Sequence, residues 1–201
     1  MSALPQFPRL HCLVSHDDDL SLLPALVDAG IDGFQVRDKA LPTGALVALT
    51  RTVLAAVRPA GVTVVVNDRL DVALAAGADG VHLGAADLAV ADARRLAPGL
   101  VVGATCRTRA EVAAAASDGA DYAGFGPVFA TDSKPGLPAP LGVAAMTDAT
   151  GLLPLLAIGG ITAGTAGEVR EAGAHGVAVI GAIWRHPDPV VAAKELLAAL
   201  A

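Results

Sequence analysis

The stretch Ala76-Gly77-Ala78-Asp79-Gly80, followed by Val81-His82-Leu83, recurs in variant form along this chain. Related stretches occupy residues 29–33, 118–122 and 172–176, and each precedes a short apolar run. A glycine directly after a helix fits the position where a positive φ angle ends the helix. The apolar runs that follow are typical of short strands. We interpret the stretch as a helix-to-strand connector that the fold uses repeatedly.

Apolar runs and helical segments, many of them Ala-rich, alternate along the whole chain. We predict eight strands, at residues 10–14, 33–37, 62–66, 80–83, 101–105, 122–125, 155–158 and 177–180. Predicted helices include residues 43–57, 90–96, 109–117, 163–171 and 189–200. Apolar strands with helical crossovers indicate a parallel sheet. Eight such units fit a small α/β fold, the (β/α)₈ TIM barrel. A doubly wound sheet is the alternative, but the recurring connector favours the more symmetric barrel, as a single domain over residues 1–201.

Composition and charge exclude several functional classes. The 201 residues carry a net charge of −6, which argues against general nucleic-acid binding, since phosphate backbones need clustered Lys and Arg. Cys12 and Cys106 show neither metal-ligand spacing nor a disulfide framework, as is typical of a reducing compartment. The first residues show no signal-peptide pattern. The uncharged stretch 149–167 is glycine-rich and barely hydrophobic, so a buried strand with its loop is a better interpretation than a membrane span. We therefore expect a cytoplasmic protein with no membrane partner.

An anion site is indicated at the end of the second predicted strand. Gln35, Arg37 and Lys39 stand at alternate positions there, so they share a face while the strand lasts. An amide and two cations on an inward face are costly unless an anion pairs with them. In TIM barrels the active site forms at the C-terminal ends of the strands. We expect a phosphate site at this position.

Two carboxylates follow the neighbouring strands. Asp68 comes after the third strand and Asp87 after the fourth. Either residue could cap the next helix, because Asn and Asp are preferred at that position. The alternative is that both converge beside Arg37 and Lys39 and hold Mg²⁺ on a diphosphate. Mg²⁺ usually binds through one or two carboxylates together with phosphate oxygens and water.

The later loops offer further groups for a phosphate. Residues 131–136 follow the sixth strand and read either as an exposed turn or as a mobile loop with two hydroxyls and one cation. Gly159-Gly160 and Gly181 follow strands seven and eight, where barrels often bind phosphate on backbone N–H groups. Tight packing is the other interpretation of these glycines. We interpret His82 as a barrel-interior packing residue with one hydrogen bond.

Together these motifs resemble the thiamine-phosphate synthase family. The resemblance rests, in order, on Gln35-x-Arg37-x-Lys39, Asn67-Asp68-Arg69, Gly80-Val81-His82-Leu83-Gly84, Gly126-Pro127-Val128-Phe129-x-Thr131-x-Ser133-Lys134 and Ala157-Ile158-Gly159-Gly160-Ile161. It implies a transferase that joins hydroxymethylpyrimidine diphosphate to thiazole phosphate, giving thiamine phosphate and diphosphate. The partners would be these two small phosphorylated substrates, and a homodimer is one assembly that the sequence leaves open.

The resemblance also implies a role for each matched residue. Catalytic residues would be Arg37, Lys39 and Lys134, which bind the diphosphate, and the metal ligands for Mg²⁺ would be Asp68 and Asp87. Substrate-binding residues would be Gln35, Asn67, Thr105, Thr131, Ser133, Gly160, Ile180 and Gly181. Asn67 would lie at the pyrimidine, and Gly160 with the backbone after Ile180 at the thiazole phosphate.

The chain departs from the family pattern at three places. The family usually has Gln at the position of Ala85, Ser followed by His at Thr105-Cys106, and often Ser at Gly181. These departures introduce a second candidate, the related thiazole tautomerase. That enzyme isomerises a thiazole carboxylate phosphate in the same barrel without Mg²⁺. The tautomerase branch tends to lose the acidic pair, and one form of it has His in place of Pro127. The presence of Asp68, Asp87, Lys39 and Pro127 in this chain therefore favours the synthase. A barrel that only binds thiazole phosphate or thiamine phosphate is a third alternative, motivated by Ala85.

Overall fold

The structure, a computed structural model that describes residues 7–131 and 139–201, contains a closed barrel of eight parallel strands. The strands are β1 (Leu10–Val14), β2 (Gly33–Val36), β3 (Thr63–Asn67), β4 (Gly80–Leu83), β5 (Val101–Cys106), β6 (Tyr122–Phe125), β7 (Leu155–Ile158) and β8 (Gly176–Val179). They pair in chain order, and β1 closes the ring by pairing with β8 through Leu10↔Val177 and Cys12↔Val179. The predicted TIM barrel is confirmed, and the doubly wound sheet is wrong because β1 and β8 are neighbours.

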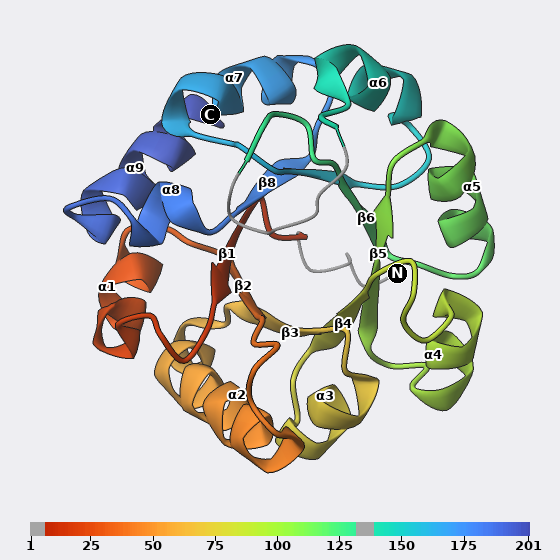
Figure 1. The fold of residues 1–201 in the computed structure, drawn as a ribbon. Coiled ribbons are helices and arrows are strands. Elements are labelled where there is room, and N and C mark those ends of the chain that lie inside the picture. The colour runs from red at the N-terminus through yellow and green to blue at the C-terminus, as the bar shows by residue number, and fades with distance from the viewer. Residues whose placement is uncertain (1–6, 132–138) are drawn as a thin grey trace.

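Helices surround the strands as an outer ring (Figure 1). They are α1 (Leu23–Asp28), α2 (Thr43–Val57), α3 (Leu70–Ala76), α4 (Val90–Leu96), α5 (Arg109–Ser117), α6 (Gly142–Ala149), α7 (Ala163–Glu171), α8 (Gly181–Trp184) and α9 (Pro189–Ala199), with 3₁₀ turns η1 (Leu20–Leu22) and η2 (Arg58–Ala60). Predicted and observed bounds of the elements agree within one residue, which is the usual uncertainty at fraying ends. Within the described ranges, no helix is long and apolar enough to cross a membrane.

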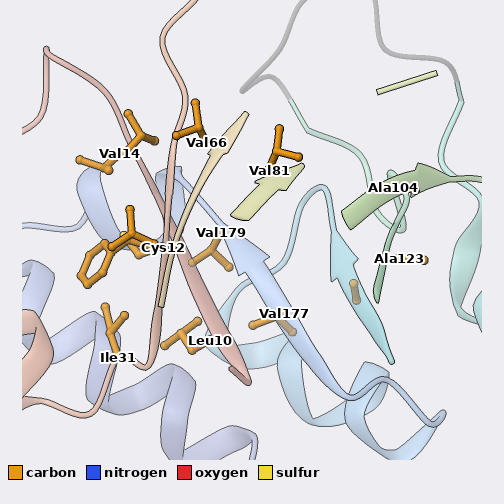
Figure 2. Close-up of a cluster of buried hydrophobic side chains, with 14 of the residues drawn as sticks. Leu10, Cys12, Val14, Ile31, Val66, Val81, Ala104, Ala123, Val177 and Val179 are labelled. Atoms are coloured by element: carbon orange, nitrogen blue, oxygen red, sulfur yellow. The ribbon is translucent and has the colours of Figure 1, made fainter. Parts of the chain in front are cut away.

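The hydrophobic core lies between the barrel and its helices. Alternate strand residues such as Leu10, Cys12 and Val14 point outward and pack with residues such as Ile31 in one buried cluster (Figure 2). The intervening residues point inward because side chains alternate along a strand. The interior is more polar than the outer core, since His11, Gln35, His82 and Tyr122 lie there. This division leaves polar groups in the barrel interior, below the strand ends.

At three places the recurring connector also bonds to the start of the neighbouring strand. The Asp32 carboxylate accepts hydrogen bonds from the backbone N–H groups of Arg9 and Leu10, at 2.9 and 2.8 Å. Asp79 accepts from Val64 N at 2.8 Å, and Asp121 accepts from Val102 N at 2.7 Å. Three connectors therefore fix strand starts through a carboxylate, at the end of the barrel away from the C-terminal strand ends.

Candidate active site

A cavity of about 440 Å³ opens at the C-terminal ends of the strands. Its lining residues come from every strand or from the loop after it: Leu13, Gln35, Arg37, Asn67, His82, Thr105, Gly126, Pro127, Ala130, Thr131, Ile158, Gly159, Gly160, Ile161, Thr162, Ala178, Val179, Ile180, Gly181, Ala182 and Arg185. This is the end of a TIM barrel where the strand-to-helix loops converge and active sites form. The cavity is mixed in character, with apolar walls and a small number of amide, hydroxyl, imidazole and guanidinium groups.

A chain of hydrogen-bonded side chains forms the floor of this cavity. The Nδ1 atom of His82 lies 3.0 Å from the Tyr122 hydroxyl, and its Nε2 atom lies 3.0 Å from Thr105 Oγ1. The Gln35 side chain also interacts with the Tyr122 hydroxyl. Burial lowers the pKa of His82 to about 4, although the charge of Asp68 acts in the opposite direction. A neutral imidazole has one donor and one acceptor nitrogen, so His82 donates to one of these two hydroxyls and accepts from the other.

Two glycines make room for these rings inside the barrel. A Cβ atom on Gly103 would overlap the ring of Tyr122, its register partner on the next strand. A Cβ atom on Gly124 would lie 2.8 Å from Cε1 of His82. Both rings are buried and cannot swing away, so side chains at these two positions would clash with the floor. The polar floor therefore requires glycine on β5 and β6.

A charged cluster lies beside the cavity at the ends of β3 and β4. The Lys39 ammonium pairs with Asp68 at 2.9 Å, and Asp87 accepts a hydrogen bond from Gly84 N at 2.8 Å. Partial burial disfavours the charged form of Asp68, but Lys39 and Asp87 outweigh it and lower the pKa of this carboxyl group. Partial burial and the adjacent Asp68 raise the pKa of Asp87. Of these two neighbouring carboxylates, Asp68 therefore holds its negative charge more readily than Asp87.

Neither carboxylate serves as a helix cap. The N-cap of α3 is Arg69 and that of α4 is Ala89, without a side-chain cap bond at either. Asp68 also adopts a φ of 65°, a left-handed conformation that non-glycine residues rarely hold. Such backbone conformations concentrate at functional sites because the surrounding structure must enforce them. The capping interpretation is therefore wrong, and the local fold directs Asp68 toward Lys39.

The opposite wall of the cavity is built from glycines after β7 and β8. Gly159 and Gly160 have φ angles of 92° and 66°, which favour glycine. A Cβ on Gly159 would lie 2.5 Å from Pro127 Cβ, and one on Gly160 would meet Phe129 Cβ at 2.7 Å. Both backbones therefore approach the loop after β6 closely. The packing interpretation holds for these two glycines, and their backbone still lines the cavity.

A model of the thiamine monophosphate synthase family matches residues 10–183. The chain belongs to this family. It is 47% identical to the thiamine-phosphate synthase of Methanoculleus marisnigri, over 89% of this chain and 85% of that protein. It is 48% identical to a thiamine biosynthesis bifunctional protein of Symbiobacterium thermophilum, covering 94% of this chain but 40% of that protein. Thiamine phosphate pyrophosphorylase from Pyrococcus furiosus superposes with a TM-score of 0.87 at 31% identity, over 96% and 95% of the two chains.

Membership of the thiamine monophosphate synthase family confirms the resemblance and the transferase class that it implied. The structure gathers most of the predicted site residues at one end of the barrel. Gln35, Arg37, Asn67, Thr105, Thr131, Gly160, Ile180 and Gly181 line the cavity, while Lys39, Asp68 and Asp87 form the adjacent charged cluster. Lys39 is not a cavity-lining residue because β2 ends at Val36, so strand alternation does not continue to position 39. Ser133 and Lys134 lie outside the described residues.

Two residues of the cavity, His82 and Arg185, differ from the predictions made from sequence. His82 was expected to make one hydrogen bond in the interior, but it makes two and lines the cavity. Its inward position in the strand pattern was the available signal. Arg185 lies in the cavity wall without having been expected there. No periodicity could have indicated this residue, because it follows the short helix α8.

Proposed function

We propose that this protein is a thiamine-phosphate synthase, which joins a pyrimidine diphosphate to a thiazole phosphate. The observation that carries the proposal is the Lys39–Asp68–Asp87 cluster beside a cavity lined by Arg37. A reaction that expels diphosphate needs cations where negative charge develops. An isomerase acting on a thiazole carboxylate expels no diphosphate and has no need of such a cluster. Family membership supports the same choice.

In this reaction the bond between the pyrimidine methylene carbon and the diphosphate oxygen breaks, and its electron pair leaves with diphosphate. The thiazole nitrogen then donates its lone pair to the methylene carbon, forming the new C–N bond. We assign Gln35, Arg37, Lys39 and Lys134 to binding the diphosphate. Arg37 lines the cavity and Lys39 lies beside it, so both cations would already be in position when negative charge develops on the leaving diphosphate.

The acidic pair fits a divalent cation. Asp68 and Asp87 interact directly, and partial burial together with this contact raises the pKa of Asp87. Mg²⁺ prefers one or two carboxylates together with phosphate oxygens, and a cation between two carboxylates removes their repulsion. We therefore assign Asp68 and Asp87 to Mg²⁺, which would neutralise charge on the diphosphate oxygens. Within the described part of the chain no group of three metal-ligating side chains occurs, so the remaining ligands would be phosphate and water.

The other proposed roles follow the shape of the cavity. Asn67 and Thr105 lie at the floor beside His82, where a flat pyrimidine ring could be recognised by its nitrogen atoms. Gly160, Ile180 and Gly181 line the β7–β8 wall, where we place the thiazole phosphate. Thr131 and Ser133 would serve the thiazole end. Exclusion of water is needed during the reaction, because a pyrimidine cation would otherwise be hydrolysed.

The proposal also covers the whole chain. We infer a cytoplasmic enzyme with one domain over residues 1–201, consistent with two free, buried cysteines, Cys12 and Cys106. A homodimer remains a prediction about its assembly, and light scattering of the purified protein would measure it.

Turnover with both phosphorylated substrates tests the proposal. The protein should form thiamine phosphate with Mg²⁺ and lose this activity when a chelator removes the metal. No thiamine phosphate, together with isomerisation of the thiazole carboxylate phosphate, would instead establish the tautomerase. Binding of either thiazole phosphate or thiamine phosphate without turnover would establish a non-catalytic barrel.

The variant Asp68→Asn tests the proposed metal role. It removes the charge but keeps a residue type that tolerates the left-handed backbone at this position. We expect turnover at limiting Mg²⁺ to fall about a hundredfold, since a metal-ligand carboxylate supplies several kcal/mol of charge stabilisation. Asp92→Asn is the matched control, because Asp92 pairs with Arg95 on the outer helix α4. Equal activity of both variants would refute the role of Asp68.

A further inference from the structure

Two arginines are present among the described residues that line the cavity. Arg37 follows β2, on the side of the barrel that carries Lys39 and Asp68. Arg185 follows α8 and lies on the wall formed by Gly160 and Gly181. The proposed reaction brings two phosphorylated substrates together, and each needs a cation. The position of Arg185 matches the second of these two anions.

Arg185 lies directly over Gly181. A Cβ atom added to Gly181 would lie 3.2 Å from Cδ, 3.3 Å from Nε and 3.6 Å from Cζ of Arg185. The whole outer part of the arginine side chain thus crosses the face of this glycine. Gly181 has a negative φ in contrast to Gly159 and Gly160, so backbone conformation does not demand glycine there. The space above Gly181 is instead occupied by the arginine side chain.

The chemistry of this wall suits a phosphate group. A guanidinium presents several N–H donors in a planar fork and pairs with two phosphate oxygens at once. Arg185 is exposed, so its charged end can meet a ligand that enters from the cavity mouth. Gly159, Gly160 and Gly181 line the cavity on the same wall as Arg185. Arg185 and the glycine wall together make an anion-binding surface.

We propose that Arg185 binds the phosphate of the thiazole substrate. The absence of a side chain at Gly181 leaves the space that the arginine side chain crosses to reach this phosphate. The inference rests on the proposed synthase function and adds a specificity-determining residue to it. Arg185 would distinguish the phosphorylated thiazole from the corresponding alcohol. It would have no effect on the pyrimidine diphosphate, which binds on the β2–β4 side.

Steady-state kinetics of Arg185→Ala test this inference. We expect the KM for thiazole phosphate to rise about tenfold, while the KM for the pyrimidine diphosphate stays unchanged. The preference for the phosphate over the thiazole alcohol should fall by a similar factor, because only the phosphate loses a partner. Arg185→Lys should recover part of this preference, since it keeps the charge and loses the fork. Arg95→Ala, on the outer surface of α4, is the control and should change neither KM.

A double-mutant cycle tests the pairing with Gly181. Gly181→Ala should displace the arginine side chain and raise the KM for thiazole phosphate a few-fold in the wild-type background. The same substitution should have a smaller effect when Arg185 is already Ala. Equal effects in both backgrounds would show that the two residues act independently and would overturn the pairing.

The inference and the proposed function can fail separately. Wild-type protein that makes no thiamine phosphate would contradict the function. Wild-type protein that makes it, while Arg185→Ala keeps both KM values and the preference for the phosphate, would overturn the role of Arg185 alone. Circular dichroism of each variant would confirm that a change in KM does not come from unfolding.

Discussion

His11 is buried in the barrel interior without a hydrogen-bond partner for either ring nitrogen within residues 7–131 and 139–201. Burial, with His82 and His175 nearby, lowers its pKa to about 3 from 6.5. Because the folded-state pKa lies below the unfolded one, protons bind the unfolded chain more readily below pH 6.5. The stability contributed by neutral His11 is therefore present above pH 6.5 and is lost as the pH falls from 6.5 toward 3.

The variant His11→Leu should make stability less dependent on pH. Leucine has no proton to bind and leaves no polar nitrogen buried beside Phe7 and Tyr122, whose rings lie tilted against His11. We expect the wild-type protein to lose about 2 kcal/mol more than the variant between about pH 6.5 and about pH 5. Urea unfolding at a series of pH values measures the difference. Parallel pH profiles for the two proteins would contradict the prediction.

Tyr122 lies under the cavity and supports side chains that line it. Its hydroxyl contacts His82 and Gln35, both of which line the cavity. Tyr122→Phe should cost about 1–2 kcal/mol of stability, because it leaves buried polar atoms without a partner. It should also raise the KM for pyrimidine diphosphate several-fold and leave the KM for thiazole phosphate unchanged. Calorimetry and steady-state kinetics measure both effects.

A second buried hydroxyl supplies the control for Tyr122→Phe. Thr50 donates to the Leu46 carbonyl at 2.8 Å inside α2, away from the cavity. Thr50→Val should lower stability by a comparable amount and change neither KM. A rise in the pyrimidine KM in both variants would mean that loss of stability, and not the floor geometry, is the cause.

At the scale of elements, the connector between helix and strand does more than end the helix. Its glycine was predicted from the sequence, because Gly30 and Gly77 have the positive φ angles expected after a helix. The role of the following aspartate was not, since a carboxylate that bonds to a neighbouring strand can be identified only once strand order is known. Asp32, Asp79 and Asp121 each act in this way.

The variant Asp32→Ala should destabilise the barrel by about 2–3 kcal/mol. It removes a carboxylate that accepts from two backbone N–H groups, and hydrogen bonds to charged groups are among the stronger ones. Thermal unfolding measures the change. Asp28→Ala, at an exposed position at the end of α1, should stay within about 0.5 kcal/mol of the wild type. Catalysis should be unaffected in both variants below their melting temperatures, because the connectors lie away from the cavity.

At the scale of the whole molecule, periodicity and the repeated connector were sufficient to predict the barrel, its strand bounds and the bounds of the helices α2, α4, α5, α7 and α9. Most of the site residues predicted from local sequence line the cavity or form the charged cluster beside it, because polar side chains at strand ends contrast with apolar strands. The contacts that long side chains make with other elements could not be predicted from the sequence. Lys39 turns to Asp68 after β2 has ended, Tyr122 crosses the interior over Gly103, and Arg185 reaches the wall from beyond α8. These contacts depend on how distant elements are placed.

One continuous hydrophobic cluster extends from Leu10 on β1 to Leu200 after α9. Because β1 pairs with β8, neither of these two strands can separate without opening the barrel. We therefore expect the protein to unfold in urea as one cooperative unit. Trp184, the only tryptophan in the sequence, reports on the β1–β8 closure, since its Nε1 donates to the Leu13 carbonyl at 2.7 Å.

Tryptophan fluorescence and far-ultraviolet circular dichroism should therefore give the same urea midpoint. The first method detects the closure at Trp184, and the second detects all helices and strands, so coincidence indicates a single transition. The variant Trp184→Phe serves as the blank for the fluorescence signal. A fluorescence midpoint at lower urea would mean that α8 and β8 separate from β1 before the rest of the barrel unfolds. It would contradict the prediction, because the shared hydrophobic core would then not hold the closing strands to the rest of the barrel.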